Sequence, residues 1–144
     1  MSFHDLPKGW PSRSLEDPVL AADVVDLVVR DSERAVGSLS LLRCDGTGRM
    51  IQPVTIEDVP HGCTEEERER VFDAFVGHLG GALGGLVLAL GRPRGRVPED
   101  PERAWHETAI RACDAGGVRL LGCYLATEDG VVAMPRWTEP RLAG

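Results

Sequence analysis

Residues 86–127 read LVLALGRPRGRVPEDPERAWHETAIRACDAGGVRLLGCYLAT, and this stretch decides the fold. Its apolar start, Gly85–Leu90, has the length and glycine flanks of a strand covered on both faces. A loop rich in Gly, Pro and Arg follows. Asp100, followed by a proline, then predicts a helix start, with an acceptor at the cap. Val118–Thr127 is a second strand, and a strand–helix–strand crossover predicts that the two strands pair in parallel.

Upstream of this crossover the sequence predicts three further strands. Polar turns at 31–34 and 45–48 separate them, and the first two are expected to pair antiparallel. Pro53 places the third strand at a sheet edge or a bulge, because proline cannot donate to the ladder. The three segments, of which the first is rich in β-branched residues, are Asp23–Arg30, Ala35–Cys44 and Arg49–Val59.

A helix is expected between the third strand and the crossover. Thr64 and Glu67 have the spacing of a capping box, and Gly80-Gly81 is expected to end the helix. Its apolar face repeats at helical spacing through Phe72, Phe75, Val76 and Leu79. After residue 127, a turn at 128–130 predicts a short returning strand over 131–134.

The expected element order is therefore β-β-β-α-β-α-β-β. A mixed sheet with helices packed on its faces is the economical α/β architecture for this order. The length of 144 residues suits one domain. We expect an irregular N-terminal arm over 1–22, a single α/β domain over 23–134 and a C-terminal tail over 135–144.

Composition indicates which classes of partner to exclude and in which cellular compartment the protein is expected. The formal net charge of −7 opposes nucleic-acid binding. No apolar run approaches the roughly 20 residues of a membrane helix, and no secretory signal is visible. Four cysteines lack any C-x-x-C pair, as expected of thiols in a reducing compartment. We expect a cytoplasmic protein with no nucleic-acid or membrane partner.

The stretch at 86–127 resembles the JAB/MPN metalloprotease family, in the variety found in RadC-type bacterial proteins. In that family an apolar strand runs into His-x-His-Pro-Ser-Gly, a helix opens at Ser-x-x-Asp, and a Gly-Ile/Val-x-Leu strand follows. Here Pro93 and Gly95 keep the proline and glycine of the loop, and residues 117–121 (GVRLL) resemble the following strand. The resemblance implies a JAB/MPN, cytidine-deaminase-like architecture.

The metal-binding residues of that family do not carry over. The family holds zinc through two histidines and an aspartate, and a glutamate handles the proton of the bound water. The histidine positions are here Leu90 and Arg92, the serine is Asp100 and the aspartate is Arg103. Leucine has no donor atom, and a guanidinium is a cation without an accessible lone pair. Glu57 matches the family glutamate only by rough position. The resemblance thus implies a domain without metal or cofactor.

A small anionic ligand at the loop after residue 90 is one alternative. Ligands of open α/β sheets gather beyond the carboxyl ends of strands, and the next helix start favours anions. The competing interpretation is a solvated loop whose arginines pair with the acids at 99, 100 and 102. The arginines concerned are Arg92, Arg94, Arg96 and Arg103.

A thiol nucleophile is the other alternative. Cys63 precedes a helix, where the helix dipole lowers a thiol pKa, and His61 lies two residues away as a potential base. Two such residues fall short of the four ligands of a structural zinc site.

The sequence favours a non-catalytic, metal-free JAB/MPN-like domain that serves as a binding or assembly module. Its partner is an unknown protein or a second copy, and the edge near Pro53 offers a surface for a homodimer. The alternative function is an enzyme with a rearranged site, either a Cys/His hydrolase or one that acts on a small anion at the Arg92–Arg94 loop.

Overall fold

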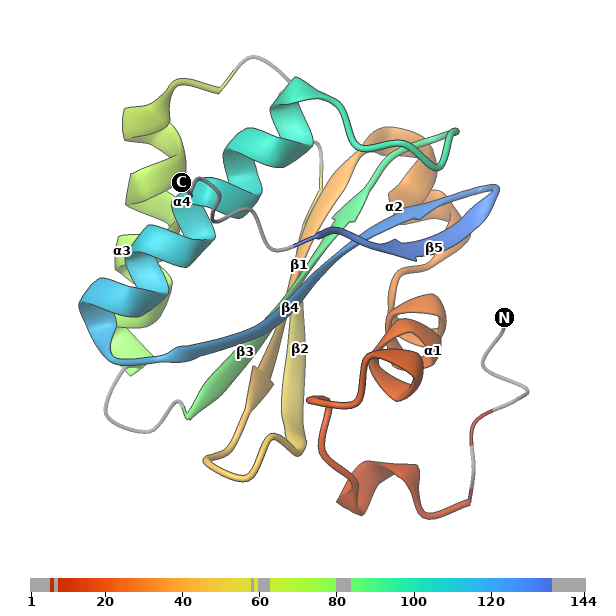
Figure 1. Ribbon diagram of the computed structural model, residues 1–144. Helices are drawn as coiled ribbons and strands as arrows, with labels where there is room; N and C mark the ends of the chain where they lie inside the picture. The colour runs from red at the N-terminus through yellow and green to blue at the C-terminus, as the bar shows by residue number, and fades with distance from the viewer. Residues whose placement is uncertain (1–5, 7, 58, 60–62, 80–83, 136–144) are drawn as a thin grey trace, which may run out of the picture.

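The computed structural model describes residues 6, 8–57, 59, 63–79 and 84–135. It is a mixed α/β structure built around a five-stranded sheet (Figure 1). The elements are a 3-10 turn η2 (Trp10–Ser12), α1 (Pro18–Val28), α2 (Asp31–Val36), β1 (Ser38–Cys44), β2 (Met50–Glu57), α3 (Glu65–Leu79), β3 (Gly85–Gly91), α4 (Asp100–Gly116), β4 (Arg119–Thr127) and β5 (Gly130–Ala133).

The strand order in the sheet is β2-β1-β3-β4-β5. β3 and β4 pair in parallel through the α4 crossover, as the sequence predicts, and every other pair is antiparallel. Helices α3 and α4 lie on one side of the sheet and α1 lies on the other (Figure 1). The predicted mixed sheet with helices on its faces is therefore confirmed.

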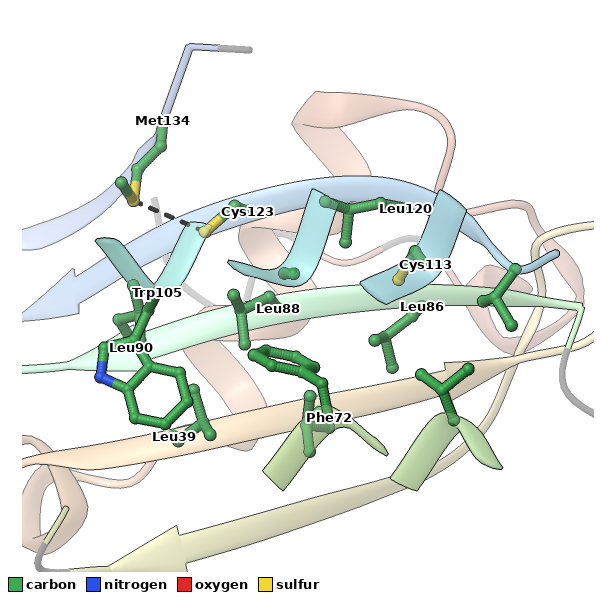
Figure 2. Close-up of a cluster of buried hydrophobic side chains, with 14 of the residues drawn as sticks. Leu39, Phe72, Leu86, Leu88, Leu90, Trp105, Cys113, Leu120, Cys123 and Met134 are labelled. Atoms are coloured by element: carbon green, nitrogen blue, oxygen red, sulfur yellow. Dashed lines mark hydrogen bonds between the residues drawn. The ribbon is translucent and has the colours of Figure 1, made fainter. Parts of the chain in front are cut away.

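Two apolar clusters hold these layers together. Under α3 and α4, the rings of Phe72 and Trp105 meet edge to face, with centroids 5.8 Å apart (Figure 2). On the other face, Leu20 and Val24 of α1 pack with Val87 of β3. Because both clusters draw on β3, all seven of its residues are buried, as its continuous apolar sequence predicts.

The predicted strand at Asp23–Arg30 is wrong. Residues 23–28 lie in helix α1, and residues 29–30 follow its end. The carboxylate of Asp17 accepts from the amides of Val19 and Leu20, and Pro18 fills the first helical position. Burial of one face of α1 against the sheet outweighs the weak helix propensity of its β-branched residues. Helix α1 also crosses the boundary expected between residues 22 and 23.

The predicted turn at 31–34 is likewise a short helix, α2. Arg34 of this helix is buried, and it donates to the carbonyls of Val29, Asp26 and Thr127 and to the Asp26 carboxylate at 2.9 Å. α2 thereby joins α1 to the end of β4. Since the first predicted strand does not exist, β1 pairs instead with β2 and β3.

Most other local predictions hold. Asp45 closes the β1–β2 turn, Pro53 lies in edge strand β2, and Thr64 and Glu67 form the capping box of α3. The cap of α4 is one residue earlier than expected, at Glu99. The expected helix end at residues 80–81 lies outside the described residues.

The described part of the N-terminal arm packs on the body. Leu15 is buried, and its amide donates to the carbonyl of Gly48 at 2.8 Å. The Arg119 guanidinium at the start of β4 pairs with the Glu16 carboxylate at 2.7 Å. Within the described residues, no helix combines the length and apolar character needed to cross a membrane.

Candidate functional site at the β3–α4 loop

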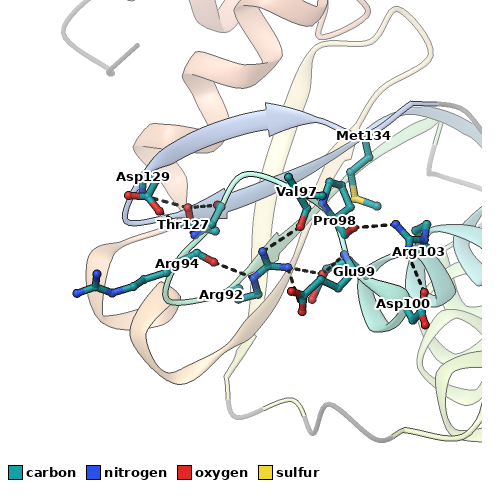
Figure 3. Close-up of polar contacts among 12 residues, drawn as sticks. Arg92, Arg94, Val97, Pro98, Glu99, Asp100, Arg103, Thr127, Asp129 and Met134 are labelled. Carbon is teal, nitrogen blue, oxygen red and sulfur yellow. Dashed lines mark hydrogen bonds and ion pairs between the residues drawn. The ribbon is translucent and has the colours of Figure 1, made fainter.

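The loop after β3 is fastened to the β4–β5 turn (Figure 3). The Asp129 carboxylate accepts from the amide of Gly95 at 2.8 Å, and the Thr127 hydroxyl donates to the Gly95 carbonyl at 2.7 Å. The amide of Glu128 donates to the carbonyl of Pro93 at 3.1 Å. These bonds fix the loop at the carboxyl ends of the parallel strands, where open α/β sheets bind ligands.

Arg92 organises the inside of this loop. Its guanidinium forms an ion pair with the Glu102 carboxylate at the start of α4, and it donates to the carbonyls of Arg94 at 2.9 Å and Val97 at 3.0 Å. The Arg92 side chain is 11% exposed and that of Glu102 is 7% exposed. The charge of Arg92 is thus neutralised within the protein.

Leu90 and Arg103 also take structural roles. The Leu90 side chain belongs to the apolar cluster beneath α4. The Arg103 guanidinium donates to the Pro98 carbonyl at 2.7 Å and pairs with Asp100 at 2.6 Å (Figure 3). The predicted pairing of the loop arginines with neighbouring acids is therefore present at both Arg92 and Arg103.

Arg94 and Arg96 face the outside of the loop. The Arg94 side chain is 80% exposed, and its nearest carboxylate is that of Glu128, at 3.8 Å. Arg96 donates from Nε to the carbonyl of Asp129 at 3.0 Å. The structure places the four predicted arginines on one loop and helix start, but it does not aim them at one point.

From the sequence, Glu102 is one of three acids that could pair with the loop arginines, and the structure assigns it to Arg92. Glu102 lines a small cavity of about 30 Å³ together with Leu90 and Gly91, whereas Arg103, one residue on, lines a different pocket. Spacing alone could not distinguish these two neighbours on α4. Glu57 lies at the exposed end of β2, and β1 separates it from β3.

The environment of Cys63 differs from the one expected for a nucleophile. Partial burial raises the pKa of its thiol, the Glu67 carboxylate raises it further, and Arg68 offsets only part of this effect. The predicted lowering of the Cys63 pKa is therefore wrong. His61 lies outside the described residues.

An apolar pocket of about 360 Å³ adjoins the loop. Val97, Pro98 and Met134 form its apolar walls, and Arg103 and Glu107 lie at its polar side. Val97 is 71% exposed, yet its carbonyl is held by Arg92. The pocket therefore has a fixed apolar rim, and its size falls within the range of ligand pockets.

The donor set for a metal ion is limited. Across the residues that the structure describes, no three His, Cys, Asp or Glu side chains are grouped so that they could hold a metal. Leu90 is a core residue, and Arg92 and Arg103 are each paired with a carboxylate. A comparison of the chain with family models and with curated proteins finds no match.

Proposed function

We propose that this chain is a non-catalytic, metal-free JAB/MPN-like domain that acts in the cytoplasm as a binding or assembly module for a protein partner. The strand–loop–helix–strand order at 85–127 and the parallel β3–β4 pair support the resemblance at the level of architecture. The pocket beside Val97 supports a binding role.

The observation that carries this proposal is the ion pair between Arg92 and Glu102. In the resemblance, Arg92 stands where the family has a zinc-binding histidine. Here its guanidinium supplies the positive charge that faces the carboxylate of α4. A metal cation brought to the same place would be repelled by Arg92 and would compete with it for Glu102. The Arg92 guanidinium thus supplies the positive charge that a metal ion would bring to this place.

Metal content is the direct test of the proposal. Elemental analysis of protein purified without chelator should find zinc well below one ion per chain. One tightly held zinc per chain would overturn the metal-free assignment. The variant L90H/R92H/R103D tests the resemblance itself, because it supplies the two histidines and the aspartate of the family's metal site at the three matching positions. We expect this variant to retain zinc through gel filtration. A folded variant that retains none would count against the shared frame.

A further inference from the structure

We infer that β2 is a self-association surface, and that two copies of this chain pair antiparallel along β2 into one continuous sheet. The partner is therefore a second copy. This inference uses only the sheet edge and its charges. It does not depend on the resemblance to JAB/MPN domains or on the fate of the metal site.

The exposure of β2 is the first observation. β2 ends the sheet, and none of its eight residues is buried on either face. α1 packs over β4 and β5, and α4 packs over β3 and β4, so these two helices cover the opposite part of the sheet. An edge strand presents unpaired amides and carbonyls, which another strand can satisfy.

The side chains of β2 offer little protection against such pairing. From Met50 to Ile56 the sequence is MIQPVTI, without a charged residue. Ile51 is 53% exposed and Ile56 is 39% exposed. Proteins usually guard a free edge with lysine, proline or a bulge. The backbone groups of β2 that face β1 are already paired with it, Pro53 removes one donor, and a bulge places an extra residue, Ile51, in the strand; the other outward-facing amides and carbonyls have no strand beside them.

The charges at the two ends of β2 identify the partner and its direction. Arg49 precedes the strand and Glu57 ends it; both are exposed, and Arg49 also pairs with Asp45 of its own chain at 3.2 Å. In an antiparallel pair of identical strands, each positive end lies beside a negative end. In a parallel pair, like charges meet. An axis at Pro53 places Arg49 opposite Glu57 at both ends and sets Met50 opposite Ile56 and Gln52 opposite Val54, so the neutral centre of the strand is covered by its own copy.

Sedimentation velocity over the micromolar range tests the association. We expect twice the chain mass for the wild type, and a monomer for I56K, which places a lysine in the covered centre. The matched control is V19K, which changes an exposed apolar residue on α1 and should leave the dimer intact. A wild-type monomer throughout this range would overturn the inference, as would a dimer that V19K disrupts and I56K does not.

Charge exchange tests the direction of pairing. R49E alone and E57R alone each put like charges at both ends of the interface, and we expect each to weaken dimerisation about tenfold. An equimolar mixture of R49E and E57R restores opposite charges at both ends. It should therefore form a mixed dimer with near wild-type affinity. The mixed pair is complementary in either direction, so the single variants decide the direction of pairing: in a parallel pair like charges already meet in the wild type, and R49E and E57R dimers as strong as the wild-type dimer would exclude the antiparallel arrangement.

Zinc analysis and sedimentation give separate answers. A zinc-bound dimer would overturn the proposed function and support the β2 interface. A zinc-free monomer that keeps its fold would agree with the proposed function and would overturn the β2 interface.

Discussion

Arg92 and Glu102 form a nearly buried ion pair that joins the end of β3 to the start of α4. The same carboxylate accepts from the amide of Glu99 at 2.7 Å, so one side chain neutralises the arginine and caps the helix. Breaking a buried pair by removing one partner leaves an uncompensated charge, which is far more costly than the net value of the pair.

We therefore expect R92M to lower the free energy of unfolding by about 3–5 kcal/mol. Urea denaturation at neutral pH measures this change. The matched control is R94M, two residues away on the exposed side of the same loop, which should change stability by less than about 0.5 kcal/mol. Equal effects of the two variants would show that the Arg92–Glu102 pair has no special role.

Cysteine alkylation tests the thiol-enzyme alternative. Because the pKa of Cys63 is raised, its thiol stays protonated at neutral pH, and its reactivity should increase only toward alkaline pH. Cys44, Cys113 and Cys123 are buried and should react only on unfolding. Iodoacetamide labelling followed by mass spectrometry measures the rates. Rapid labelling of Cys63 at neutral pH would instead favour a nucleophilic role.

The pH dependence of stability should include a contribution from Asp45. Hydrogen bonds, above all from the Thr47 hydroxyl at 2.6 Å, lower the pKa of this carboxyl from 3.8 to about 2. A lowered folded-state pKa gives stability that is present above the unfolded pKa and is lost as the pH falls through the folded value. D45N should therefore lose less stability than the wild type as the pH falls from 3.8 to about 2. Parallel urea titrations that show the same acid slope for both proteins would contradict this assignment.

The capping box of α3 gives a local prediction. The Thr64 hydroxyl accepts from the amide of Glu67 at 3.1 Å, and the Glu67 carboxylate accepts from the amide of Thr64 at 2.8 Å. T64A removes the first of these bonds and should cost about 1 kcal/mol of stability. T64S keeps the hydroxyl and should cost much less. Thermal unfolding midpoints of T64A and T64S, measured against the wild type, test this prediction; equal losses in the two variants would contradict it.

The sequence predicts the sheet and the two later helices well, because local signals and tertiary packing agree there. The run Gly85–Leu90 is apolar throughout, and β3 is covered on both faces. The prediction is wrong for Asp23–Arg30, where β-branched residues favour a strand in isolation but the segment packs as a helix. Asp17-Pro18 repeats the acid–proline helix start recognised at Asp100-Pro101, so a local signal for α1 was present.

The position of the candidate site in the fold was predictable from the sequence, but the acid that pairs with Arg92 was not. The crossover fixes the loop at the carboxyl ends of β3 and β4, and the arginines of that loop are visible in the sequence. Which acid meets Arg92 depends on the rotation of α4 about its axis. That rotation is set by the packing of Trp105 and Ala109 in the core, which no spacing rule specifies.

Thr127 contacts two segments that are far apart in the sequence, helix α2 and the β3–α4 loop. Its carbonyl accepts from Arg34, and its hydroxyl donates to Gly95 in the β3–α4 loop. A ligand that displaced this loop would therefore strain the attachment of the N-terminal helices. We therefore expect amide hydrogen exchange in α1 to respond to a ligand that displaces the β3–α4 loop, because Thr127 contacts both the loop and Arg34.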